Sequence, residues 1–308
     1  MNRFKCILVG LLNVLFFISC QDDEEVRDQE VGSMIEPNIE DLLVDRDTIQ
    51  GLPQDTDTIT NAETLEEIDT TTDSVEVSPD STELEEPPFE MIGELDGYVL
   101  KETFGFNVYI SEEALGIDSL LTSRTYDLVN DKLAEVFTLG IPIQIVEELK
   151  LTPIFMEWAS NNGSAFYNPS TKENLIANGS IAEKSQSIEI SNIKNFYDWT
   201  LLNQPYLVLH ELSHAYHFRV LGLDQEDINQ AYRNATLFNL YESVPYNGGN
   251  GNISQNSTAY ALNNKIEFFA ELTEAYFGEN DYFPFVKEDL ATYDTVGFNM
   301  IIKLWQLE

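Results

Sequence analysis

Cysteine is nearly absent from this sequence. The 308 residues contain two copies, Cys6 and Cys20, and both lie close to the amino terminus. Everything after residue 20 therefore lacks the thiols that would form a disulfide or bind a metal through sulfur. A folded domain in that part must be held by its apolar core. Any metal site there must be built from histidine and carboxylate side chains.

Positive charge is also scarce. There are 16 Lys and Arg against 54 Asp and Glu, a net charge of -38 at pH 7. Such a chain repels nucleic acid and anionic lipid, which excludes both as partners bound through charge. Between residues 20 and 90 only Arg27 and Arg46 are basic, and no aromatic residue precedes Phe89. Because so little apolar surface cannot offset chain entropy, we expect residues 20–90 to be a disordered acidic tether before a globular domain at 91–308.

The first 19 residues have the pattern of a secretory signal peptide. Arg3 and Lys5 precede an apolar run that is shorter than the roughly 20 residues of a membrane span. The run ends in Phe-Ile-Ser-Cys, which resembles the lipobox of bacterial lipoproteins, with Phe17 in place of the usual Leu. The resemblance implies a lipid on Cys20, an anchor in the bacterial outer membrane and, from the acidic residues that follow, exposure at the cell surface. The alternative is ordinary cleavage with Cys20 unmodified.

Histidine is rarer still, and its 3 copies, His210, His214 and His217, fall in one stretch. The first two belong to an H-E-x-x-H motif that contains Glu211. A helix turns about 100° per residue, so His210 and His214 can face one metal ion while Glu211 reaches a water on it. This pattern is typical of zinc hydrolases, in which the carboxylate is the general base. The alternative is a buried helix whose histidines are satisfied by hydrogen bonds.

A catalytic zinc site usually has three protein ligands, so a third must be found. His217 lies two turns from His210, about 10 Å along a helix axis, which is too far to share one metal with it. A predicted helix downstream carries Glu267, Glu271 and Glu274 on one face. A solvated face would also explain this stripe. The rest of the helix is apolar enough to be buried, however, and a buried carboxylate needs a partner or a metal.

Together, H-E-x-x-H and the downstream Glu-Phe-Phe-Ala-Glu resemble the gluzincin metallopeptidases, in particular the group of anthrax lethal factor and Mlc titration factor A. The resemblance covers residues 200–280. It implies Zn²⁺ as the cofactor, Glu267 as the third ligand and Tyr260 as the residue that stabilises the transition state. Those families have Asp three residues after the second histidine, where this chain has His217. Because a ligating histidine usually donates its other N–H to a carboxylate, we expect Glu271 to accept it; the alternative for Glu271 is a surface or helix–helix contact.

The resemblance also implies an α+β, zincin-like domain, in which a small twisted sheet is joined to the H-E-x-x-H helix and the third-ligand helix. Apolar runs predict strands at residues 98–110, 154–158 and 187–190. Helical periodicity predicts helices at 123–139 and 224–235 and a C-terminal pair. We expect Ile188–Ile190 to be the edge strand for an extended substrate, with an interior strand as the alternative. Residues 246–254, rich in Gly and Asn, should form a mobile loop.

These observations favour a zinc-dependent peptidase that acts on peptides or proteins at the cell envelope or surface. An aminopeptidase would need an anionic subsite for the substrate's amine, for which Glu242, Glu271 and Glu274 are candidates, whereas an endopeptidase would not. The alternative is a catalytically silent, metal-bearing surface lipoprotein that binds a ligand, although such a module has no use for a general base at Glu211. A toxin-like effector is a weaker reading, because the single lipid anchor argues for a resident enzyme.

Overall fold

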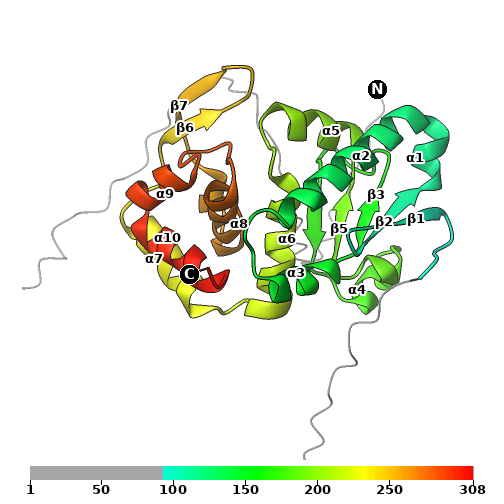
Figure 1. The fold of residues 1–308 in the computed structure, drawn as a ribbon, viewed down its shortest axis with the longest axis horizontal. Coiled ribbons are helices and arrows are strands. Elements are labelled where there is room, and N and C mark those ends of the chain that lie inside the picture. Colours follow the sequence, from blue (N-terminus) through cyan, green and yellow to red (C-terminus); the bar gives the residue numbers. More distant parts are fainter. Residues whose placement is uncertain (1–92, 308) are drawn as a thin grey trace, which may run out of the picture. The chain divides into compact units, whose positions relative to one another are not determined.

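A computed structural model describes residues 93–307, which have a mixed α+β architecture as predicted (Figure 1). The strands are β1 (Tyr98–Thr103), β2 (Phe106–Ser111), β3 (Ile154–Met156), β4 (Phe166–Asn168), β5 (Ser187–Ile190), β6 (Val244–Asn247) and β7 (Ile253–Ser257). The α-helices are α1 (Glu112–Ile117), α2 (Ser119–Val136), α3 (Ile143–Lys150), α4 (Lys172–Ala177), α5 (Ile193–Leu202), α6 (Leu207–Tyr216), α7 (Glu226–Leu237), α8 (Lys265–Phe277), α9 (Lys287–Tyr293) and α10 (Thr295–Leu304). Shorter helical turns are η2 (Ala182–Lys184), η3 (His217–Leu221) and η4 (Tyr260–Leu262).

Five strands form one mixed sheet in the order β1-β2-β3-β5-β4. β2, β3 and β5 run parallel, while β1 and β4 pair antiparallel at the two edges. Successive side chains of a strand point to opposite faces. In β3, Ile154 and Met156 therefore enter the main core, while Phe155 stacks on Tyr109 at the other face, with 4.9 Å between ring centroids.

Two expectations about short segments are wrong. β5 lies between β3 and β4, so the edge strand on that side is β4 and not Ile188–Ile190. β4 has 3 residues, too few to show an alternating pattern in the sequence. Residues 246–254 were expected to be a loop, but their flanks belong to β6 and β7, which pair antiparallel as a second sheet. The connection, residues 248–252, is rich in Gly and Asn, and Gly249, Asn250 and Gly251 have the positive φ angles that such hairpin turns use.

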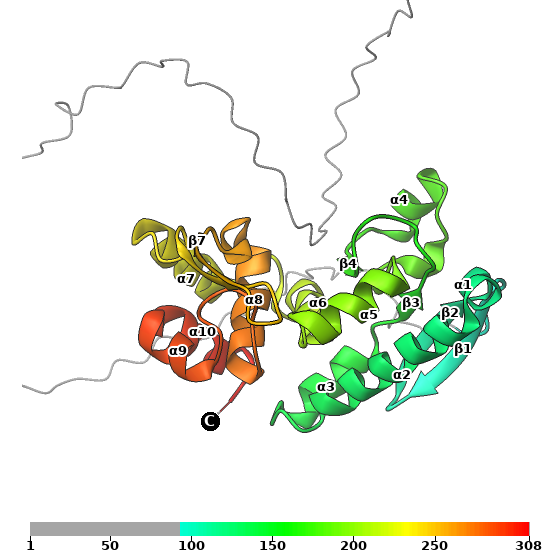
Figure 2. The ribbon, with the colours of Figure 1, turned by 90° about the horizontal axis from the view of Figure 1, so that it is seen from above.

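α6 and α8 lie at the centre of the domain. α6 contacts α2, α3, β4 and β5 as well as α8, and α8 contacts α7, α9, α10 and η4. Figures 1 and 2 show the consequence: the five-stranded sheet with α1 to α5 lies on one side of α6, and α7 to α10 with the β6–β7 hairpin lie on the other. The helix predicted to carry the three glutamates and the C-terminal helix pair are both present.

Every residue of α6 is buried, which is expected of a helix packed between two layers. Its last residue, Tyr216, stacks on Trp305 with 4.7 Å between ring centroids, and its hydroxyl donates to the Leu304 carbonyl at 2.9 Å. These contacts give α6 a single position between the halves of the domain. Within residues 93–307, no helix has both the length and the apolar character needed to cross a bilayer. The predicted signal peptide, Cys20 and the tether lie outside the described residues.

Candidate metal centre

Two helices bring the candidate residues together. α6 carries His210, Glu211 and His214, with the two histidines one turn apart. Glu267 lies in the first turn of α8, where the Asn264 side chain caps the helix and accepts a hydrogen bond from the Glu267 N–H at 3.1 Å. Since α6 and α8 pack directly against each other, this cap determines where Glu267 meets the histidines.

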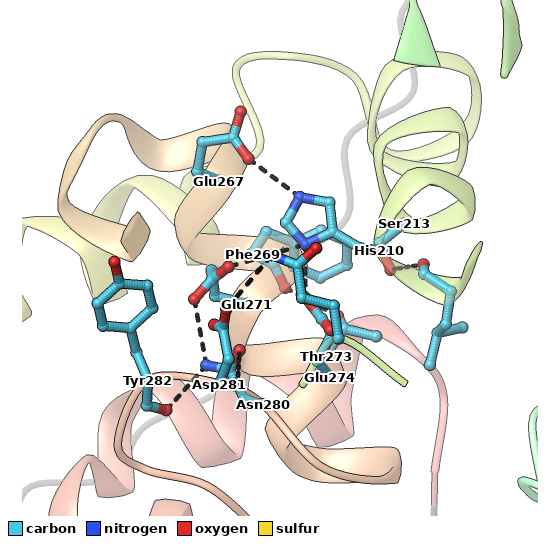
Figure 3. Close-up of polar contacts among 12 residues, drawn as sticks. His210, Ser213, Glu267, Phe269, Glu271, Thr273, Glu274, Asn280, Asp281 and Tyr282 are labelled. Atoms are coloured by element: carbon cyan, nitrogen blue, oxygen red, sulfur yellow. Dashed lines mark hydrogen bonds and ion pairs between the residues drawn. The ribbon is translucent and has the colours of Figure 1, made fainter. Parts of the chain in front are cut away.

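One oxygen of Glu267 faces both histidines. Its Oε2 lies 3.1 Å from Nε2 of His210 and 3.3 Å from Nε2 of His214. Figure 3 shows the approach of Glu267 to His210. Two ligand atoms with bonds of about 2.0–2.1 Å to one tetrahedral zinc ion stand roughly 3.3–3.4 Å apart. The two distances to Glu267 are therefore close to what one ion requires, and the ligand atoms of all three side chains lie within 4.8 Å of one another, so the group could hold a metal.

Several buried polar atoms at this cluster lack partners, which is a second indication of a cation. Both ring nitrogens of His214, Oε1 of Glu267 and Oε2 of Glu211 find no hydrogen-bond partner among the described residues. An unsatisfied buried group costs about 1–3 kcal/mol. A metal ion between His214 and Glu267 would satisfy part of this set. The donor set and its unpaired atoms thus fit a bound metal.

The Nδ1 atom of His210 forms a hydrogen bond with a different glutamate from the one expected. Its Nδ1 lies 2.6 Å from Oε1 of Glu274 but 3.9 Å from Oε1 of Glu271. The hydrogen bond predicted for Glu271 is therefore made by Glu274, further along α8 (Figure 3). Helical spacing places both glutamates on one face, and only the crossing of α6 and α8 selects between them. Because this bond occupies Nδ1, the metal position is at Nε2.

Glu271 is held by the segment that follows α8. Asn280 Nδ2 donates to its Oε2 at 3.1 Å, and the next residue, Asp281, accepts from Gln204 at 3.3 Å. Burial and the neighbouring charges of Asp281 and Glu274 raise the pKa of Glu271 well above its usual range. This shift favours the uncharged form of Glu271, which makes the burial of Glu271, Glu274 and Asp281 less costly. Sequence reasoning missed Asn280 and Asp281, because no helical spacing links them to either motif.

The charges at the cluster are strongly coupled. Burial by itself would raise the pKa of Glu267, but the charge of His214, the hydrogen bond to His210 and the charge of His210 lower it to about 2. Burial would lower the pKa of His210, but hydrogen bonds to Glu267 and Glu274 outweigh it and raise this pKa well above the usual value. The carboxylates therefore favour a positive charge at this position. A metal ion would take the place of the proton, because ligands bind it in unprotonated form.

Glu211 has the surroundings of a general base. Burial raises the pKa of its carboxyl group, and the charges of His210 and His214 partly oppose this shift. β4 contacts α6, so the edge strand lies beside the helix that carries Glu211. A carboxylate with a raised pKa is better matched to proton transfer near neutral pH.

Tyr260 and His217 are not in the group that could hold a metal. Tyr260 is half-buried at the start of η4, which contacts α8, and its role in the transition state stays a prediction. His217 is outside the group of His210, His214 and Glu267 that could hold a metal. It packs against Phe269, with 5.5 Å between ring centroids. His217 is therefore a packing residue in this structure, as the helix geometry predicted.

Comparison with known proteins adds no relative. A scan against protein-family models, a search of the curated proteins and a search of the solved structures each found no match. The function must therefore be inferred from the site's own residues and geometry.

Proposed function

We propose that this protein is a zinc-dependent peptidase of the gluzincin type, with a zincin-like fold. One observation carries the proposal: Oε2 of Glu267 stands 3.1 and 3.3 Å from the Nε2 atoms of His210 and His214. Beside His210 in the sequence is a buried glutamate with an oxygen that has no hydrogen-bond partner. That glutamate is Glu211. A metal site that served only to hold the fold together would have no use for this buried carboxylate, which is costly without a partner.

Zinc is the proposed metal because two imidazoles and one carboxylate, with the fourth position left to water or substrate, form a known catalytic zinc donor set. The same three donor types also occur at non-haem iron sites, so measuring the bound metal in protein purified without added metal separates the two. When bound, zinc would supply a Lewis acid that polarises the scissile carbonyl and makes water more acidic.

The proton transfers are assigned to Glu211. Its carboxylate accepts a proton from the attacking water and then delivers it to the nitrogen of the leaving amine. Glu274 keeps the proton of His210 on Nδ1, which leaves Nε2 free to bind a metal. Tyr260, by resemblance, donates a hydrogen bond to the developing oxyanion. Loss of one such donor costs about 2.7–4 kcal/mol of transition-state stabilisation.

The proposed substrate is a peptide or protein segment that lies in extended form along β4. Among the described strands, β4 is paired on one side only, with β5. β4 contacts α6, the helix that carries Glu211, so a chain laid along this strand would pass close to the base. Main-chain hydrogen bonds to an edge strand supply affinity that is largely independent of sequence.

The place of action is proposed from the amino-terminal sequence, residues 1–25. The resemblance of residues 17–20 to a lipobox supports a lipid on Cys20 that anchors the protein in the bacterial outer membrane, with the domain at the cell surface. In a Gram-negative host, Cys20→Ser should then shift the protein out of the membrane fraction. Retention in that fraction would contradict the anchor.

The test of the activity compares the full chain with its Glu211→Gln variant on a diverse peptide mixture, with products identified by mass spectrometry. The substitution preserves the side chain's shape and the metal ligands but removes the base. We expect cleavage by the wild type and rates lower by about 10²–10⁴-fold in the variant. If both proteins bind zinc and neither cleaves any peptide, the catalytically silent binding lipoprotein becomes the better description.

A further inference from the structure

The geometry of the buried acids bears on which peptide bonds such an enzyme can cleave. In an amino-terminal residue the ammonium nitrogen stands about 2.5 Å from the scissile carbonyl carbon. An aminopeptidase therefore needs an anionic group on the open side of the metal, within hydrogen-bond reach of that nitrogen. Without such a group, the substrate's charge would be buried unpaired, which is strongly unfavourable.

Two of the three candidate anions lie on the wrong side of His210. The metal position is at Nε2, which faces Glu267. Glu274 and Glu271 lie at the other ring nitrogen, 2.6 and 3.9 Å from Nδ1. The imidazole ring therefore stands between these carboxylates and the metal. Asp281 lies on the same side as Glu271, because its N–H donates to Asn280, whose side chain donates to Glu271 (Figure 3).

The third candidate, Glu242, is exposed in the segment between α7 and β6, and it is not among the buried acids of the centre. The remaining buried acids also have other partners. Glu157 and Glu189 pair with Lys184 at 2.7 and 2.9 Å, and Asp294 caps α10. Among the described residues, no buried carboxylate besides the base and the ligand is left to bind a substrate's amine.

Two cations close to the ligands in the sequence, Lys265 and Arg219, also have partners within the protein, which bears on a substrate's free carboxylate. Lys265, just before Glu267 in α8, donates to Asn229 at 2.9 Å. Arg219, in η3, donates to the main-chain carbonyl of Glu148. A carboxypeptidase would need a cation free to pair with the terminal carboxylate. The described site thus offers a partner to neither end of a peptide.

We propose, on the basis of the zinc peptidase function above, that the enzyme is an endopeptidase. Its substrate would be an extended internal segment, in which the scissile bond is flanked by uncharged peptide groups. These groups can hydrogen-bond to β4 and need no charged subsite.

The test uses the full zinc-loaded chain and a randomised decapeptide library in two matched forms, one with free termini and one acetylated and amidated. We expect both forms to be cut at the same internal bonds, at rates within about twofold, because solvent-exposed terminal charges contribute little. Glu211→Gln should cut neither form. Glu242→Gln, which removes the exposed candidate anion, should behave like the wild type.

The other outcomes separate this inference from the proposed function. Release of single amino-terminal residues from the free form alone would overturn the endopeptidase assignment and leave the zinc peptidase intact. Loss of cleavage of free peptides alone in Glu242→Gln would identify an amine subsite there, with the same consequence. If zinc is bound and the wild type cuts neither form, the proposed function fails and this inference fails with it.

Discussion

The 2.6 Å hydrogen bond between Nδ1 of His210 and Glu274 is the contact that orients the first histidine. Replacing Glu274 by Gln keeps the size of the side chain but removes the charge that makes the imidazole a stronger ligand. We expect Glu274→Gln to weaken zinc binding by about 10–100-fold. Competition with a fluorescent chelator measures the change without an activity assay.

Glu271→Gln is the matched control for that substitution. Glu271 lies on the same face of α8, but its carboxylate is 3.9 Å from Nδ1 and accepts a hydrogen bond from Asn280. A glutamine can still accept that bond, so we expect the zinc affinity to stay within about threefold of the wild type. Equal losses in the two variants would show that neither glutamate has a special role at His210.

His217 should make the fold sensitive to acid. Burial and the charges of His214 and Lys265 lower its pKa from the usual 6.5 to about 4. Between pH 6.5 and 4, His217 therefore binds a proton in the unfolded chain but not in the folded protein. Above pH 6.5 His217 is unprotonated in both states and does not change the stability. As pH falls from 6.5 to 4, protonation of His217 in the unfolded chain lowers the free energy of unfolding by about 1.4 kcal/mol per pH unit, up to roughly 3 kcal/mol.

His217→Leu should remove this loss. Both ring nitrogens of His217 are without a partner among the described residues, so we expect the variant to be at least as stable as the wild type at pH 7.5. Its advantage should grow at pH 5. Urea unfolding of both proteins in metal-free form measures this, because zinc release then does not contribute. A stability difference that is the same at both pH values would refute the prediction.

Among the secondary-structure elements, the β6–β7 hairpin ties the two halves of the domain together. Gly249 at its tip has φ of 81° and lies against Leu202, the last residue of α5. Asn203 donates to the Tyr246 hydroxyl and to the Asn247 carbonyl, both at 3.2 Å. The hairpin therefore holds the connection that leads into α6, which carries two of the three candidate metal ligands.

Gly249→Ala should weaken this attachment. A Cβ atom there would lie 2.6 Å from the Leu202 side chain and 2.9 Å from its carbonyl oxygen. Gly251→Ala is the control, because Gly251 has a similar φ of +77° but no atom within 4 Å of the added Cβ. We expect a loss of about 1–2 kcal/mol in the control from backbone strain alone, and at least about 1 kcal/mol more at Gly249. Equal losses in thermal unfolding would mean that the tip is free to move away.

For the molecule as a whole, zinc should act as a cross-link. Two ligands come from α6, which packs on the sheet, and one from α8, which packs on the C-terminal helices. Free zinc at 1,000 times its dissociation constant should stabilise the folded state by about 4 kcal/mol. Removing it with a chelator should lower the melting temperature by roughly 8–16 °C. In Glu267→Ala the chelator should have much less effect, and a full effect there would place the metal elsewhere.

The local chemistry of the centre could be predicted from sequence because it depends on helix periodicity. His210, Glu211 and His214 are on one helix, and residues four apart share a face in any α-helix. The same reasoning placed Glu267, Glu271 and Glu274 on a single face of α8. It could not distinguish between Glu271 and Glu274, since both satisfy the periodicity equally well.

Three features were decided only by the tertiary structure. The crossing of α6 and α8 brings Glu274, and not Glu271, to His210. The pairing of β4 with β5 makes a 3-residue strand the edge beside Glu211. The hairpin β6–β7 appears where the sequence indicated a loop. Each of these depends on contacts between segments far apart in the chain, where the geometry of packing and not the local residue pattern selects the partner.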